Sequence, residues 1–256
     1  MTRAVKKKLK AIAEKMPLVH TAGYTEGLAD GEGQGGIAEE ALALITKHMR
    51  KYVTNYDNLF DGSSLGDAEF SVIMANWKAD GNATFKNASY MFRNTKNVSE
   101  ALYTDNLDFS GCVSLLSAFE GSTVKKLKAI NAISTVDGWS GMANMFYLSS
   151  IESIEAFYPS KNTTFNGTFT QSYNLKRVIF ESEIAVDKLN LGYSKSLDRD
   201  SIESVVKNLS LNTSGLSVTI SETALNNAFE GGENNADWLD LIAGITNWNI
   251  TIQDYQ

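Results

Sequence analysis

The chain repeats one pattern of apolar and polar positions between residues 60 and 202. In each copy an aromatic residue opens a short polar turn, an apolar residue follows five or six positions later, and another usually follows three positions after that. The opening residues are Phe60, Phe92, Phe119, Phe146, Phe169 and, with a weaker match, Tyr193. The gaps between them are 32, 27, 27, 23 and 24 residues. Repeats of this length are typical of stacked units that cannot bury an apolar face alone.

The apolar residues after each turn predict one short strand per unit. They are Val124, Leu127 and Ile130, then Ile151, Ile154 and Phe157, then Leu175, Val178 and Phe180. We expect these strands to run parallel along one face and the aromatic residues to stack in the interior. Each buried aromatic side chain would contribute roughly 1.5–3 kcal/mol of transfer free energy.

Two amphipathic helices are predicted before the repeats. Val5, Leu9, Ile12 and Met16 share one face of a helix over 4–16, which Pro17 ends. A second helix over 37–52 places apolar and aromatic residues on a stripe suited to attachment or oligomerisation. The stripe consists of Ile37, Ala41, Leu44, Ile45, His48 and Tyr52. The glycine-rich stretch 23–36 between the two helices is interpreted as a hinge.

The pattern changes after residue 197. Residues 200–209 predict an amphipathic helix with Asp200 as its N-cap and Glu203 three positions on. A strand over 216–220, short helices over 222–229 and 236–243, and a strand over 248–252 follow. The chain therefore divides into a helical N-terminal segment (1–54), the repeats (55–197) and an α+β C-terminal cap (198–256).

The repeats resemble leucine-rich repeats of the BspA-like kind. The aromatic anchors and the residues before them match the start of that repeat: Met91–Phe92, Ala118–Phe119, Met145–Phe146 and Thr168–Phe169. Leu175, Val178 and Phe180 match its strand. The resemblance covers roughly residues 55 to 202, with uneven spacing and without the cysteine common in the turn. It implies an α/β repeat fold: a right-handed leucine-rich-repeat solenoid with short parallel strands.

A second resemblance lies near the start of the chain. Residues 8–27 are similar to leaders on tail-associated and other structural proteins of bacteriophages, with Ile12, Pro17, Gly23 and Gly27 at matching positions. This resemblance implies a component of a virus particle. The lysine-rich start continues with charged residues where a signal peptide would need an apolar run, so no export signal is expected.

Charge, hydropathy and cysteine content limit the kinds of partner and site that the chain can be expected to have. The net charge is −7, and residues 1–16 contribute +5, so the remaining chain carries −12. An acidic repeat body disfavours a nucleic-acid groove. No stretch is long and apolar enough to span a membrane. Cys112 is the single cysteine and is expected to be a small buried residue of a repeat.

No assembled catalytic set is evident, so we expect no enzyme, no cofactor and no metal. Ser64 sits in a G-x-S-x-G sequence, but both histidines, His20 and His48, precede it, whereas a nucleophile elbow needs a later one. Gly31, Gly33 and Gly36 satisfy the dinucleotide pattern, but a helix rather than a strand precedes them. Carboxylate pairs at Asp198/Asp200 and Glu181/Glu183 could serve a glycosidase, although nothing sets them apart from surface acids.

What remains is a surface that could bind a partner. Tyr103, Trp139, Tyr147, Tyr158 and Tyr173 lie near strand or turn positions, where aromatic side chains can contact sugars or proteins. Packing between repeats is the alternative for each.

We expect a non-enzymatic structural or adhesive protein of a bacteriophage virion, in the tail, a fibre or the capsid decoration. Its expected partners are other virion proteins, itself as a homo-oligomer such as a trimer, and a host surface glycan or protein. The alternative is a BspA-like adhesin or interaction module of a gut bacterium, at the cell surface or in the cytoplasm.

Overall fold

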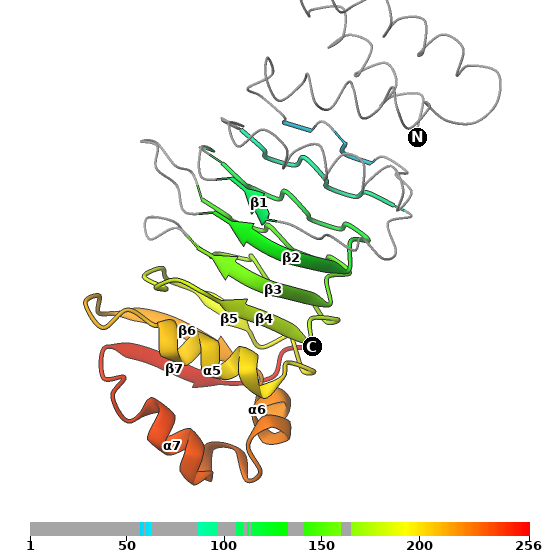
Figure 1. The fold of residues 1–256 in the computed structure, drawn as a ribbon. Helices are drawn as coiled ribbons and strands as arrows, with labels where there is room; N and C mark the ends of the chain where they lie inside the picture. The colour runs from blue at the N-terminus through cyan, green and yellow to red at the C-terminus, as the bar shows by residue number, and fades with distance from the viewer. Residues whose placement is uncertain are drawn as a thin grey trace, which may run out of the picture.

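The computed structural model describes residues 57–58, 60–62, 87–96, 106–109, 112, 114–132, 141–159 and 165–256 (Figure 1). The predicted helices over 4–16 and 37–52 lie outside these residues, as does the glycine-rich stretch. The proposed attachment stripe, Tyr103, Trp139 and Ser64 are outside them as well.

Four parallel strands form the first sheet, and their spatial order follows the chain. They are β1 (Asn106–Asp108), β2 (Lys126–Asn131), β3 (Ser153–Tyr158) and β4 (Arg177–Phe180). Figure 1 shows them side by side, with the C-terminal elements at one end. The prediction of parallel strands after the turns is therefore confirmed for three units, whereas β1 was not predicted.

Equivalent repeat positions pair across this sheet. Leu127 pairs with Ile154 and Ile154 with Val178, and all three side chains are buried. Exposed and buried residues alternate at the start of β2, as expected where one face of a sheet packs on the core. The apolar spacing noted in the sequence thus fixes which face of each strand points inward.

The phenylalanines that open the units stack in one interior column, as the sequence predicted. Ring centroids along the series Phe60, Phe92, Phe119, Phe146 and Phe169 are 5.4, 5.1, 5.4 and 5.5 Å apart. All five side chains are buried. Tyr193, the weak sixth anchor, is half-buried and contacts Tyr173 and Tyr255 instead. The column therefore ends at Phe169 in the described part of the chain.

Each phenylalanine of the column lies between two residues with left-handed backbone conformation. These flanking pairs are Asn58 and Gly62, Tyr90 and Asn94, Ser117 and Gly121, Asn144 and Leu148, and Gly167 and Gln171. Their φ angles lie between 52° and 71°. Tyrosine, leucine and glutamine rarely adopt this conformation, which costs roughly 1–2 kcal/mol for a residue with a side chain. The surrounding stack must therefore impose it.

A hydrogen-bond ladder between successive turns supplies that constraint. In the turn around Phe119, the N–H groups of Ser117, Phe119 and Gly121 donate to carbonyls of the next turn at 2.8–2.9 Å. The N–H groups of the residues between them donate within the turn, so local and inter-turn bonds alternate. The same alternation holds in the turns around Phe92 and Phe146, and in the described residues of the turn around Phe60.

A column of buried hydroxyl groups runs beside the phenylalanines. It consists of Thr95, Ser122, Ser149, Ser172 and Ser194. Ser172 Oγ donates to Phe146 O at 2.7 Å, and Ser194 Oγ donates to Ser172 O at 3.3 Å. Ser149 Oγ alone among the described buried side-chain oxygens and nitrogens has no hydrogen-bond partner.

This difference predicts opposite effects of two similar substitutions. Ser149→Ala should leave the free energy of unfolding unchanged or raise it by up to about 1 kcal/mol, because it removes a buried hydroxyl that forms no bond. Ser172→Ala should lower the free energy of unfolding by about 1 kcal/mol, because it removes a bond to Phe146 O. Urea denaturation of both variants measures the difference, and equal losses would contradict the assignment.

The C-terminal part holds a second parallel sheet and three α-helices. The strands are β5 (Leu189–Leu191), β6 (Leu216–Ile220) and β7 (Trp248–Ile252), in that order. The helices are α5 (Arg199–Asn208), α6 (Glu222–Ala228) and α7 (Ala236–Ile242), with a 3-10 turn at Gly232–Asn234. The predicted strands and helices of this region are confirmed, whereas β5 was not predicted.

One expected detail of α5 is wrong. The helix begins at Arg199, and its N-cap is Asp198, whose carboxylate accepts from Ser201 N at 2.8 Å. Asp200, the predicted N-cap, lies in the first turn. Asp198 and Asp200 both precede the apolar positions of the helix, and the sequence pattern did not show which of the two is the N-cap.

A single apolar core connects both sheets, from Phe60 to Trp248. Cys112 is buried within it, as predicted. The described residues include no helix with the length and apolar character to cross a bilayer. The assignment of this stack to the leucine-rich-repeat class and its right-handed winding stay predictions.

Candidate binding site

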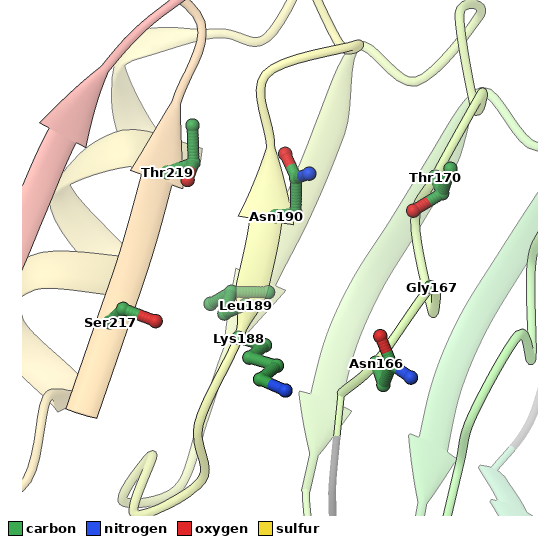
Figure 2. Close-up of a pocket in the computed structure, with 8 residues that line it drawn as sticks. All are labelled: Asn166, Gly167, Thr170, Lys188, Leu189, Asn190, Ser217 and Thr219. Atoms are coloured by element: carbon green, nitrogen blue, oxygen red, sulfur yellow. The ribbon is translucent and has the colours of Figure 1, made fainter.

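A polar pocket of about 260 Å³ lies where the turn ladder meets the second sheet. The last turn contributes Asn166, Gly167 and Thr170, and β5 and β6 contribute the rest (Figure 2). Those from the second sheet are Lys188, Leu189, Asn190, Ser217 and Thr219. We call this the junction pocket. Its side chains are mostly amides and hydroxyls, with one cation.

A change in backbone geometry accounts for the junction pocket. The last turn begins to pair with the next segment, since Phe165 N donates to Asp187 O at 3.4 Å. The following residues of that segment form β5, which is extended and pairs with β6. An extended strand advances about 3.3 Å per residue, whereas a turn with alternating left-handed residues advances less. The two segments therefore separate after the first bond.

Hydrogen bonds to Asp187 fix the position of Ser217, which lines the pocket. Asp187 Oδ1 accepts from Ser217 Oγ at 2.8 Å, from Ser217 N at 3.0 Å and from Lys188 N at 2.8 Å. Burial alone would raise the pKa of Asp187, but these hydrogen bonds together lower the pKa below its usual range. Asp187 is therefore ionised at neutral pH and stands beside the Lys188 cation.

Three tyrosines form a row of ring contacts, and two of them, Tyr173 and Tyr193, follow the pocket residues Thr170 and Asn190 by three positions in the chain. Tyr193 contacts Tyr173 edge-on, with centroids 5.8 Å apart, and stacks on Tyr255 at 5.0 Å. Tyr173 is 47% exposed, and the other two are half-buried. Gly192 lets Tyr255 approach the backbone, because a Cβ at this position would lie 2.7 Å from Tyr255 Cε2. We call this the tyrosine row.

Only one of the predicted contact residues belongs to this row. Tyr173 is in it, whereas Tyr147 and Tyr158 are half-buried, and within the described residues no ring contact joins either one to Tyr173. Tyr158 ends β3, where it pairs with Asn131. The sequence analysis missed Tyr193 and Tyr255 as contact candidates, because it assigned Tyr193 to the interior column. The tyrosines at 173, 193 and 255 have no regular spacing that would have revealed the row.

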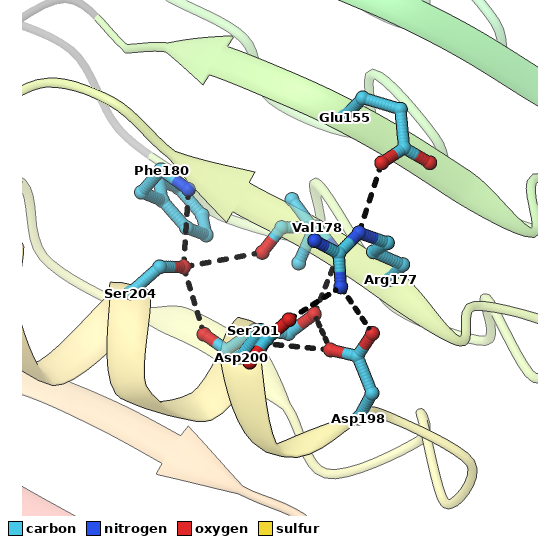
Figure 3. Close-up of polar contacts among 8 residues, drawn as sticks. All are labelled: Glu155, Arg177, Val178, Phe180, Asp198, Asp200, Ser201 and Ser204. Atoms are coloured by element: carbon cyan, nitrogen blue, oxygen red, sulfur yellow. Dashed lines mark hydrogen bonds and ion pairs between the residues drawn. The ribbon is translucent and has the colours of Figure 1, made fainter.

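Helix α5 closes the edge of the first sheet. Ser201 Oγ accepts from Val178 N at 2.9 Å, and Ser204 Oγ accepts from Phe180 N at 3.1 Å (Figure 3). Asn208 Nδ2 donates to Phe180 O at 2.8 Å. Side chains of one helix thus replace the neighbouring strand that β4 lacks, and so protect an edge that could otherwise pair with another chain.

The carboxylates considered as catalytic candidates take part in this closure. Arg177 Nη1 binds Asp198 Oδ2 at 2.6 Å and Asp200 Oδ2 at 3.1 Å, and Arg177 Nε binds Glu155 Oε2 at 2.9 Å (Figure 3). Burial would raise the pKa of Asp198, but bonds from Ser201 and Arg177 lower it overall. A carboxylate held ionised as an N-cap cannot serve as the general acid of a glycosidase.

The lowered pKa of Asp198 predicts how one substitution depends on pH. Asn can replace Asp as an N-cap, so Asp198→Asn removes mainly the charge pair with Arg177. A folded-state pKa below the ordinary value gives stability that is present above about pH 4 and lost as pH falls through the folded pKa. At pH 7 the variant should be less stable by under about 1 kcal/mol, because solvent screens the pair. Thermal melts should show this difference shrinking below pH 4, and a constant difference would contradict the role of the charge.

The described residues hold no other chemistry of note. No group of three or more His, Cys, Asp or Glu side chains among them could bind a metal ion. Glu183, from the second carboxylate pair, accepts a hydrogen bond from Ser210 Oγ.

Comparisons of this chain with protein-family models, with curated proteins and with solved structures find no match. The case for function therefore rests on the sequence and on the geometry above.

Proposed function

We propose that this chain is a non-enzymatic binding protein of a bacteriophage particle. Its repeats would form a BspA-like leucine-rich-repeat solenoid, and the N-terminal segment would attach it to the particle as a homo-oligomer. The repeat body and cap would then bind a glycan or protein of the host surface. The similarity of residues 8–27 to phage structural leaders supports the link to a virion.

The tyrosine row is the observation that carries the binding role. Three aromatic rings in contact, one of them 47% exposed, offer a rigid surface of low conformational entropy beside polar groups. The acidic groups near Arg177 are engaged in structure, so they do not favour an enzyme.

A binding experiment tests the role of the tyrosine row. The full chain, applied to an array of bacterial surface glycans and to immobilised host-cell envelopes, should bind, and Tyr173→Ala should lower the affinity about tenfold, or about 1.4 kcal/mol. Tyr158→Ala removes a half-buried tyrosine of β3 and serves as the matched control. Equal binding of both variants, or no binding by the unmodified chain, would overturn the role.

The virion assignment needs a separate test. Antibodies raised against the chain should label phage particles in electron micrographs of a culture that produces it. Label on the bacterial cell surface and not on particles would instead favour a BspA-like adhesin.

A further inference from the structure

The inter-turn ladder ends at the junction pocket with donors that have no acceptor. In the turns around Phe60, Phe92, Phe119 and Phe146, the N–H groups of the phenylalanine and of both left-handed residues donate to the next turn, as far as the described residues show. The equivalent groups of the last turn belong to Gly167, Phe169 and Gln171. None of these three N–H groups makes a hydrogen bond in the described part of the chain. Gly167 lines the junction pocket directly.

Side chains around the pocket also have unused hydrogen-bonding capacity. The hydroxyls of Thr170 and Thr219, the Asn190 Nδ2 group and the Lys188 ammonium form no hydrogen bond in the described part of the chain. Asn190 Oδ1 accepts from Gly192 N at 2.9 Å, which directs the amide nitrogen away from that bond. The pocket therefore presents donors from the backbone and from Asn190, together with hydroxyls that can both donate and accept.

Charge and size restrict the ligand. Lys188 is the one charged residue that lines the pocket, and its charge interacts with the ionised Asp187 carboxylate beneath Ser217, so the two charges offset one another and favour neither an anion nor a cation. Its volume of about 260 Å³ is below the roughly 300–1,000 Å³ of pockets that take drug-sized ligands. A small neutral molecule with several hydroxyl groups matches both properties, because each hydroxyl can donate and accept.

We propose that the junction pocket binds a single neutral sugar residue of a glycan, with Gly167 N–H, Thr170, Asn190 and Thr219 as its hydrogen-bonding partners. This inference rests on the proposed binding function and names its ligand class. Tyr173 follows Thr170 by three residues, and Tyr193 follows Asn190 by three residues, so both segments lead from the pocket to the tyrosine row. Further sugar units of the same glycan would extend over that row.

Gly167 has a backbone reason to be glycine in this site. Its φ is +71°, and a Cβ there would collide with Asn144 Oδ1 of the preceding turn. Replacing Gly167 would therefore disturb the fold, and the test must use other residues.

The test uses the full chain with methyl glycosides of glucose, galactose, mannose and N-acetylglucosamine as probes. At least one should shift the amide NMR resonance of Gly167 at millimolar concentration. Thr170→Val and Thr219→Val should each weaken that binding about threefold to tenfold. Thr251→Val is the matched control, because Thr251 pairs with Thr219 in the sheet and does not line the pocket. Thermal melts establish that all three variants are folded.

The outcomes separate this inference from the proposed function. Glycoside binding that the two pocket variants weaken and Tyr173→Ala leaves intact supports the pocket. If no glycoside binds while the chain binds intact glycans through Tyr173, the pocket assignment is overturned and the binding function stands. A Gly167 shift with acetate or inorganic phosphate but not with glycosides also overturns it, as does glycoside binding that both threonine variants retain. Failure to bind glycosides, glycans and envelopes alike overturns both.

Discussion

Replacing Phe146 by alanine is expected to lower the free energy of unfolding by about 3–5 kcal/mol. The ring is fully buried and stacks between Phe119 at 5.4 Å and Phe169 at 5.5 Å. Its removal leaves a cavity in the middle of the column that neither neighbour can fill, because the turn ladder fixes both backbones. Urea denaturation followed by tryptophan fluorescence measures the loss.

Two control substitutions test whether the loss of stability depends on removing a buried ring. Leu239→Ala truncates a side chain of α7 that is 49% exposed, so it should cost under about 0.5 kcal/mol. Phe146→Leu keeps most of the apolar volume and should cost less than Phe146→Ala. A Phe146→Ala variant as stable as the unmodified chain would remove this residue from the core.

Replacing both Ser201 and Ser204 by alanine should lower the free energy of unfolding by about 2–5 kcal/mol. Each serine supplies the acceptor for one buried amide of β4, Val178 N at 2.9 Å and Phe180 N at 3.1 Å. A buried donor left without an acceptor costs roughly 1–3 kcal/mol. Ser201→Ala alone should account for the larger share, because Ser201 is fully buried and water cannot take its place.

The effect should be specific to the edge of the sheet. Ser196→Ala removes an exposed serine hydroxyl two residues before Asp198 and should change stability by under about 0.5 kcal/mol. Loss of the closure should also expose β4 to pairing, so the double variant should form dimers or aggregates that light scattering detects. A double variant that stays as stable and as monodisperse as Ser196→Ala would contradict the closure.

The interior of the stack could be predicted from the sequence. The aromatic anchors and the apolar residues three apart are periodic, and burial depends on that periodicity. The phenylalanine column and the pairing of Leu127, Ile154 and Val178 follow from it. The strands and helices after residue 198 were also predicted, because β-branched and apolar residues there alternate with clear turn residues, whereas β5 was not.

The left-handed turns and the candidate site could not be predicted in the same way. Tyr90, Leu148 and Gln171 have no local preference for positive φ, and contacts with neighbouring turns impose it. The junction pocket exists because a turn meets an extended strand, which is a property of two segments and not of either sequence. The tyrosine row likewise joins residues that are distant in sequence, because Tyr173 and Tyr193 are 20 positions apart and Tyr193 and Tyr255 are 62 positions apart.

The turn ladder has a consequence for how the chain can be lengthened. Successive anchors are 32, 27, 27 and 23 residues apart, yet the turns around Phe60, Phe92, Phe119 and Phe146 donate the same inter-turn bonds to the turn that follows each of them. Extra residues are therefore accommodated outside the turns. Foreign peptides inserted between a strand and the following turn should leave the scaffold intact. One residue added next to a phenylalanine would instead shift the later N–H groups of that turn by one position, so that they no longer face the carbonyls of the next turn.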